Sequence, residues 1–143
     1  MTTNKAVLIP WEMDKDIEVI DLEQGNLDAI YDRIAPESRL FSVSSFRHFA
    51  LYYDDEGLYT QPEHQNLRAM VLWGAEEGVP LSRFRYPLVG NYLVVGPADD
   101  EGENTDVPEG IIRMVQDVST SVRDMLAKAH ADILAALENR GQE

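Results

Sequence analysis

The densest group of side chains that could carry chemistry is an acidic loop, Asp99 to Asp106. It holds five carboxylates and no base: Asp99, Asp100, Glu101, Glu103 and Asp106. Calcium prefers carboxylate oxygens, but a calcium loop needs them at fixed offsets around its glycine. Placing Gly102 at the sixth position puts Pro97 at the first and Pro108 at the twelfth, where carboxylates are required. No metal site is therefore expected, and the loop is interpreted as a solvated turn before a helix.

A second acidic turn, Asp54-Asp55-Glu56-Gly57, follows a run of apolar residues. The calcium test fails here as well, because it places Tyr52 at the first ligand position. An acidic turn that ends in glycine is typical of a short hairpin, since glycine supplies the positive φ. The sequence predicts that the chain reverses here before Leu58-Tyr59.

The three histidines, His48, His64 and His130, show no metal-ligand spacing. His48 follows the serine-rich segment 42–45, which would allow a nucleophile–base pair to be drawn. The sequence contains no nucleophile elbow and no oxyanion motif to complete such a site. We therefore assign no catalytic residue, and no cofactor is expected.

Arg83-Phe84-Arg85-Tyr86 alternates cations with aromatic rings, as proteins that bind single-stranded nucleic acid do. Two arginines neutralise few phosphates, so direct nucleic-acid binding is not expected. One interpretation is an edge strand whose arginines face solvent or pair with the acidic loop. The alternative is a small-ligand or enzymatic cleft near Arg83, Arg85 and His48.

Composition and charge narrow the class of protein. The chain has 143 residues, 44% of them hydrophobic, and a net charge of −14 from 26 acids and 12 bases. This charge repels nucleic acid but permits an acidic protein that competes with nucleic acid for a basic partner. The absence of cysteine excludes disulfides and thiol chemistry. The N-terminus does not read as a signal peptide and no apolar run reaches the ~20 residues of a membrane span, so we expect a cytoplasmic protein.

The first third of the chain predicts two strands and a helix. Segments 5–9 and 17–22 suggest a hairpin, with Ile17, Val19 and Leu22 turned towards a core. After Gly25-Asn26, apolar residues recur at helical spacing from Leu27 until Pro36 stops the helix.

The middle of the chain predicts a sheet core. Segments 39–46 and 48–53 are typical of strands, and 88–95 of a buried strand. Segment 66–73 is either a helix capped by Asn66 or another strand, and its length does not decide. The sequence thus predicts an α+β fold with a small mixed or antiparallel sheet and one or two short helices.

A long C-terminal helix is predicted beyond Pro108. Its apolar stripe consists of Ile111, Val115, Val118, Val122, Met125, Ala129, Ile133 and Leu137. Thirty helical residues span ~45 Å, whereas a 100-residue domain has a radius of gyration of only ~13 Å. We expect the first half to pack on a domain of residues 1–110. The predicted helix occupies 111–143. Its second half then needs a partner, either another protein or an identical copy of the chain.

A family resemblance runs through KAVLIP, IEVIDLE, LYYDDEGLY and LVGNYLVVGPADDEGENTDVP. The chain resembles, from Lys5 to Met114, the small domain-of-unknown-function family thirty-eight forty-six, which is frequent in actinobacteria and their phages. The turn Asp55-Glu56-Gly57 and the glycine-flanked strand 89–96 carry most of the likeness. The resemblance implies an α+β domain of mobile-element origin and carries over no catalytic residue.

The function expected from these observations is non-enzymatic. An acidic phage or mobile-element protein would bind and modulate a host protein in the host cytoplasm. In a more specific form of this hypothesis, the protein mimics nucleic acid. We expect the contact to combine two acidic segments with one helix face. Its residues are Asp54, Asp55, Glu56, Asp99, Asp100, Glu101, Glu103, Asp106, Val122, Met125, Ala129, Ile133 and Leu137.

Overall fold

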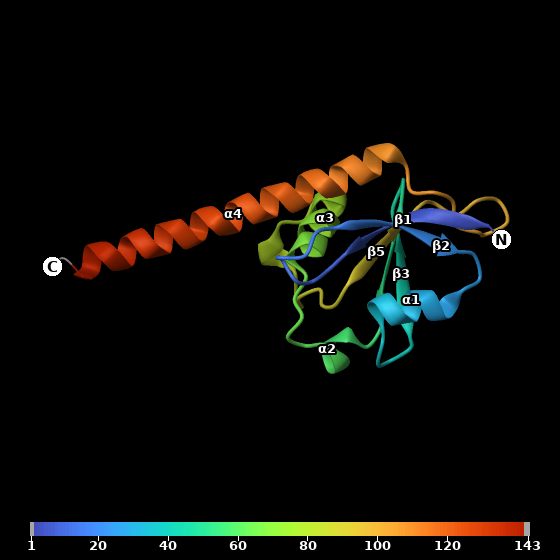
Figure 1. Ribbon diagram of the computed structural model, residues 1–143, viewed down its shortest axis with the longest axis horizontal. Coiled ribbons are helices and arrows are strands. Elements are labelled where there is room, and N and C mark those ends of the chain that lie inside the picture. The colour runs from blue at the N-terminus through green and yellow to red at the C-terminus, as the bar shows by residue number, and fades with distance from the viewer. Residues whose placement is uncertain (1, 142–143) are drawn as a thin grey trace.

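β5 (Tyr92–Val95) is the central strand of a five-stranded antiparallel sheet in the computed structural model, which describes residues 2–141 (Figure 1). In spatial order the strands are β2 (Glu18–Glu23), β1 (Thr3–Ile9), β5, β4 (Ala50–Asp54) and β3 (Phe41–Ser45). All four residues of β5 are buried, because it pairs with a strand on each side and both of its faces are covered. The predicted α+β class is confirmed, and the sheet is antiparallel. The buried strand predicted over 88–95 is present but shorter, at Tyr92–Val95.

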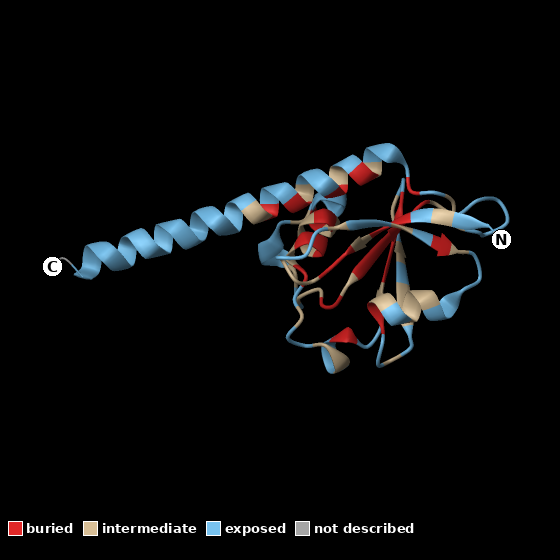
Figure 2. Cartoon of the chain, viewed as in Figure 1, coloured by how far each residue is buried: buried red, intermediate tan, exposed pale blue. Residues whose placement is uncertain are grey.

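The two faces of the sheet bury different residues, because neighbours along a strand point to opposite sides. Val7, Leu51 and Val94 lie on the face covered by α3 (Leu67–Glu77) and the first half of α4 (Glu109–Gly141). Ala6 and Leu93 lie on the opposite face, against α1 (Leu27–Ile34). Burying a Val or Leu side chain fully contributes about 1.5–3 kcal/mol. The sheet therefore supplies the core on both sides (Figure 2).

Two asparagines begin the helices on the two faces. Asn26 Oδ1 accepts from the backbone N–H of Ala29 at 3.1 Å, and the predicted helix α1 is confirmed. Asn66 Oδ1 accepts from the N–H of Ala69 at 3.0 Å and begins α3. Segment 66–73, for which helix and strand were both open, is therefore a helix, and it continues past Gly74 to Glu77.

β2 turns different residues towards the core than expected. Val19 is 47% exposed. Val19 lies opposite Val7 and so shares its face, but β2 is one of the two edge strands and Val19 is not part of the core on that face. Leu22 packs on the other face, beneath α1. Of the three residues expected to turn inward, Ile17 is half-buried, Leu22 is buried and Val19 is not.

The expected hairpin at Asp54–Gly57 is wrong. The chain instead enters a short helix, α2 (Gly57–Thr60), and Gly57 is not among the residues with positive φ. The carboxylate of Asp54 accepts from the N–H of Glu56 at 3.0 Å, which bends the chain towards the helix. Gly57 is needed for space rather than for its φ, because a Cβ there would lie 2.8 Å from Cγ2 of Val89. Segment 81–87 is likewise no edge strand, since it forms the short 3₁₀ helix η1 (Leu81–Arg83) and an irregular stretch.

The long C-terminal helix is confirmed as the 33-residue α4. Its first half buries Ile112, Val115, Ser119 and Val122. Every residue from Asp124 to Gly141 is exposed, and Figure 1 shows this part extending beyond the rest of the molecule. These 18 residues, called the projecting segment below, span ~27 Å at ~1.5 Å per residue. No helix within residues 2–141 is long and apolar enough to cross a membrane.

Candidate functional site

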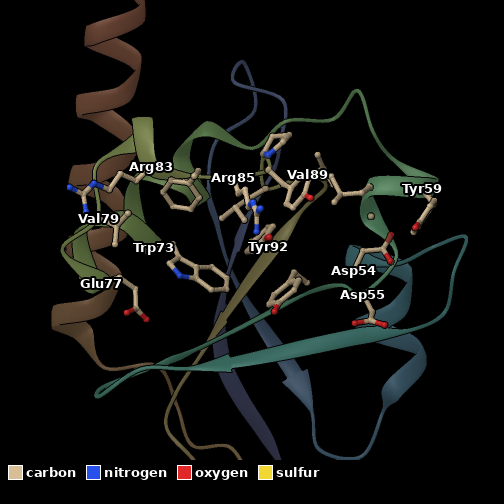
Figure 3. A pocket seen from close by; sticks show the side chains of 17 residues that line it. Asp54, Asp55, Tyr59, Trp73, Glu77, Val79, Arg83, Arg85, Val89 and Tyr92 are labelled. Carbon is tan, nitrogen blue, oxygen red and sulfur yellow. The ribbon is translucent and has the colours of Figure 1, made fainter.

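A cavity of about 590 Å³ opens on the α3 side of the sheet, which is within the range of small-molecule pockets. β4, β5, α2, α3 and the irregular segment after η1 contribute its walls (Figure 3). Its lining includes three aromatic, two basic and three acidic side chains: Tyr53, Trp73, Tyr92, Arg83, Arg85, Asp54, Asp55 and Glu77.

Three aromatic side chains pack together along one wall of the cavity. Tyr53 and Tyr92 share a face because Tyr52 and Leu93 are paired across β4 and β5. Their rings stack with centroids 5.2 Å apart and planes 11° from parallel. Trp73, from α3, contacts Tyr53 edge-on at 5.7 Å. The wall is therefore apolar and rigid, which suits a planar ligand.

The hydroxyl of Tyr92 is the polar group of this wall. Tyr92 is 2% exposed, and its hydroxyl forms no hydrogen bond with residues 2–141, whereas the hydroxyl of Tyr53 lies 3.1 Å from Ser44 Oγ. Burial raises the pKa of Tyr92 well above its usual range, with smaller contributions from Tyr53 and Asp54. The hydroxyl thus stays protonated and is available to donate a hydrogen bond into the cavity.

The two arginines of the predicted cleft do line the cavity, but His48 does not. His48 is exposed in the turn between β3 and β4. Figure 3 shows the guanidinium of Arg85 directed over the middle of the cavity, whereas that of Arg83 points away from it. Neither arginine pairs with a carboxylate among residues 2–141, including those of the acidic loop. Arg85 is therefore a cation without a counterion at the mouth of the cavity.

Asp54 lies at one end of the cavity, and its carboxylate accepts hydrogen bonds from other residues of the protein. It is 5% exposed and accepts from Ser38 Oγ at 2.7 Å, Thr60 Oγ1 at 2.8 Å and Gln61 Nε2 at 2.9 Å. Burial acts to raise its pKa, but these hydrogen bonds together outweigh burial and leave the pKa below its usual value. Asp54 therefore holds β4, α2 and the segment before β3 together. Asp55 and Glu56 are exposed.

The acidic loop lies elsewhere, at the end of the molecule opposite the projecting segment (Figure 1). Asp99 Oδ1 accepts from the N–H groups of Glu101 and Glu103, and Asp106 accepts from the N–H of Lys5. Asp100, Glu101 and Glu103 are exposed. No group of three or more Asp, Glu or His within residues 2–141 is arranged to hold a metal ion. The acidic segments and the helix face expected to form one contact thus lie apart.

The projecting segment carries most of the helix face that the sequence singled out. Met125, Ala129, Ile133 and Leu137 are exposed there, whereas Val122 is buried against the domain. Leu126 and Leu134, which the periodic stripe omitted, are 39% and 47% exposed. The unpartnered apolar surface is therefore wider than a single heptad seam.

Sequence reasoning missed a buried arginine, Arg68 on α3. Arg68 is 1% exposed and donates to the carbonyls of Pro10 and Glu12 and to Ser119 Oγ, at 2.8, 2.9 and 3.1 Å. Burial lowers its pKa, and the nearby Arg123 lowers it further. Arg123 on α4 donates to the carbonyls of Met13 and Lys15. The two arginines together fix the β1–β2 loop against both helices.

Comparison with known proteins identifies a family but no function. The family model described as "Domain of unknown function (DUF3846)" matches residues 5–120. Neither the curated proteins nor the solved structures contain a match. The match includes the sheet except for the first two residues of β1, the whole cavity, and α4 as far as residue 120, and it ends before the projecting segment. Since it covers most of the sequence, the chain belongs to the DUF3846 family.

Proposed function

We propose that this protein is a non-enzymatic, acidic interaction protein of phage or mobile-element type. It binds and modulates a protein partner through the projecting segment of α4. The observation that carries the proposal is the apolar face of residues 124–141, which is helical, exposed and without a partner among the described residues.

The exposed face continues the buried one. Val115 and Val122 pack on the domain, and Ala129 and Ile133 follow at the same helical spacing and therefore lie on the same side. Five large side chains remain 39–59% exposed along it: Met125, Leu126, Ile133, Leu134 and Leu137. Most of the stability of a helix in a protein comes from the packing of its apolar face, which this segment lacks. A partner that covered the face would bury this surface and stabilise the helix together.

The charge of the projecting segment also favours an apolar contact. Asp124, Asp132 and Glu138 stand against Lys128 and Arg140, so the segment carries −1 of the net −14. Most of the acidic charge lies on the domain, where Asp100, Glu101 and Glu103 are exposed. A second contact there with a basic partner is the nucleic-acid-mimicry form of the proposal, and it is separable from the helix contact.

The test uses two pairs of substitutions on α4 with the same gain of charge. Ile133→Asp with Leu137→Asp alters the apolar face, and Ala131→Asp with Ala135→Asp alters the opposite face. Sedimentation first reports self-association, and tagged protein then captures partners from a host lysate. We expect the first pair to abolish either self-association or capture of a specific protein that the control pair retains. Identical behaviour of wild type and both variants would refute a helix-based contact.

A separate arm tests the acidic loop. Asp100→Asn with Glu101→Gln and Glu103→Gln removes three charges from exposed side chains. The mimicry form predicts that these amides weaken capture of a basic partner and that added salt does the same. If the amide variant captured the partner as well as wild type, the mimicry form would be rejected and only the apolar helix contact would remain as a proposal.

The cavity favours ligand binding over catalysis for the alternative function. Of the predicted cleft residues it includes Arg83 and Arg85 but not His48. The hydrogen bonds among residues 2–141 include none between a serine and a histidine, so the described chain assembles no nucleophile and base of that type.

A further inference from the structure

The cavity beside β5 joins a stacked aromatic wall to one unpaired cation. We propose that it binds a small planar aromatic molecule that carries a single negative charge, such as an aryl carboxylate. This site is independent of the projecting segment, which contributes no residue to it.

Arg85 supplies the attraction for the anion. Its guanidinium lies over the middle of the cavity in Figure 3. It pairs with no carboxylate among residues 2–141, and the one cation–π contact among these residues involves Arg39 and Tyr31 instead. A planar guanidinium presents paired N–H donors that match the two oxygens of a carboxylate. A ligand carboxylate would therefore provide the partner that the protein does not.

The aromatic wall selects the shape of the ligand. Trp73, Tyr53 and Tyr92 present apolar surface along the cavity. The Tyr92 hydroxyl is the polar exception, because Tyr92 lines the cavity although it is only 2% exposed, and its hydroxyl forms no hydrogen bond within the described residues. It would donate to a carbonyl, ether or carboxylate oxygen of a ring system that lies against the wall.

The acids at the cavity edge limit the charge of the ligand. Asp54, Asp55 and Glu77 all line the cavity, and the chain as a whole carries −14. Asp54 is occupied by its hydrogen bonds, while Asp55 and Glu77 are exposed. A second negative charge on the ligand would meet these carboxylates without a further cation directed into the cavity, since Arg83 points away (Figure 3). A monoanion is therefore favoured over a phosphate or nucleotide.

Trp73 provides an internal reporter for binding. The chain has two tryptophans, and Trp11 stacks on His64 at 4.1 Å, where it takes no part in the cavity. Trp11→Phe leaves Trp73 as the source of indole fluorescence. All variants below are made in this background, and calorimetry of the full chain provides a second measurement.

Four naphthalene probes separate charge from shape: 2-naphthoate, 2-naphthyl phosphate, 2-naphthylmethanol and 2-naphthylmethylammonium. We expect 2-naphthoate to change the Trp73 signal saturably and to bind more tightly than the other three. Arg85→Gln should weaken 2-naphthoate about tenfold, the effect of a partly exposed charged hydrogen bond. The matched control Arg83→Gln makes the same charge change on a side chain directed away and should have little effect. Tyr92→Phe should weaken binding about fivefold, as for a neutral hydrogen bond.

Three results would overturn the proposal. These are the absence of saturable 2-naphthoate binding, tighter binding of the ammonium, neutral or phosphate probe, and equal losses from Arg85→Gln and Arg83→Gln. A circular dichroism melt of each variant shows whether it is folded. Because Arg85 is exposed, its substitution is expected to leave the melt unchanged. These outcomes are independent of partner capture by the projecting segment, so failure of one proposal does not decide the other.

Discussion

Removing the side chain of Asn66 should destabilise the protein far more than removing that of Asn26, although both begin a helix. Asn66 is fully buried and makes three hydrogen bonds: Oδ1 accepts from Ala69 N–H at 3.0 Å, and Nδ2 donates to the carbonyls of Ile9 and Gly90, both at 2.9 Å. Loss of a helix cap costs about 0.5–2 kcal/mol. Each buried carbonyl deprived of its donor adds about 1–3 kcal/mol. We expect Asn66→Ala to lower the free energy of unfolding by about 3–5 kcal/mol, of the typical 5–15 kcal/mol total.

Asn26→Ala is the matched control, because Asn26 is exposed and makes only the cap hydrogen bond, at 3.1 Å. It should cost about 1 kcal/mol. The measurement is urea unfolding followed by tryptophan fluorescence and circular dichroism, with the m-value compared to confirm two-state behaviour. If Asn66→Ala lay within 1 kcal/mol of Asn26→Ala, the two buried carbonyl contacts would not stabilise the fold as argued.

Further predictions concern pH, packing and the long helix. The hydrogen bonds of Asp54 lower its pKa in the folded state despite burial. The stabilisation from the ionised carboxylate is therefore present above the unfolded pKa of about 3.9 and is lost as pH falls through the folded pKa. Between pH 7 and pH 2 the urea midpoint should fall less in Asp54→Asn than in wild type, and equal falls in the two proteins would contradict this. Gly57→Ala should lower the free energy of unfolding by about 1–3 kcal/mol, because the added Cβ would lie 2.8 Å from Val89 Cγ2. Gly110→Ala on α4 is the control, because the space around Gly110 is open. In the same urea assay it should be neutral or stabilising by up to about 1 kcal/mol. A chain that ends at Arg123 should melt within about 3 °C of the full chain, because residues 124–141 are all exposed; a much lower melting temperature would show that the projecting segment packs on the domain.

Local pattern was sufficient for the elements that local physics determines. The run Tyr92–Val95 is apolar throughout and became the central strand. The cap at Asn26 and the stop at Pro36 bracketed α1, and the unbroken periodicity after Pro108 predicted α4. These elements are fixed by residues within a few positions of one another.

Long-range contacts account for the errors. The turn at Asp54–Gly57 has a hairpin composition, but the carboxylate of Asp54 is also bound by Ser38, sixteen residues earlier, and by Thr60 and Gln61 beyond the turn. Arginine on a helix usually lies on the protein surface, so the sequence around Arg68 does not indicate burial. Its hydrogen-bond partners Pro10 and Glu12 lie 58 and 56 residues earlier in the sequence. No short-range pattern carries such information.

The cavity illustrates the same limit for function. Its wall takes Tyr53, Trp73 and Tyr92 from three elements, and only the pairing of β4 with β5 stacks the two tyrosines. Sequence reasoning selected Arg83 and Arg85 from their alternation with aromatic residues, but it could not tell which guanidinium would face the cavity. It also added His48, which the β3–β4 turn places outside.

The arrangement of α4 separates the two proposed activities. Arg68 and Arg123 fix the β1–β2 loop against α3 and α4 up to the last packed turn of the helix, and the family match ends at residue 120, close to the same point. Beyond it the helix extends without a buried residue. The cavity lies wholly within the matched residues 5–120, whereas the projecting segment begins after them and contributes no residue to the cavity. Ligand binding by the cavity and partner binding by the projecting segment are therefore proposals about separate parts of the chain, and each can be tested without the other.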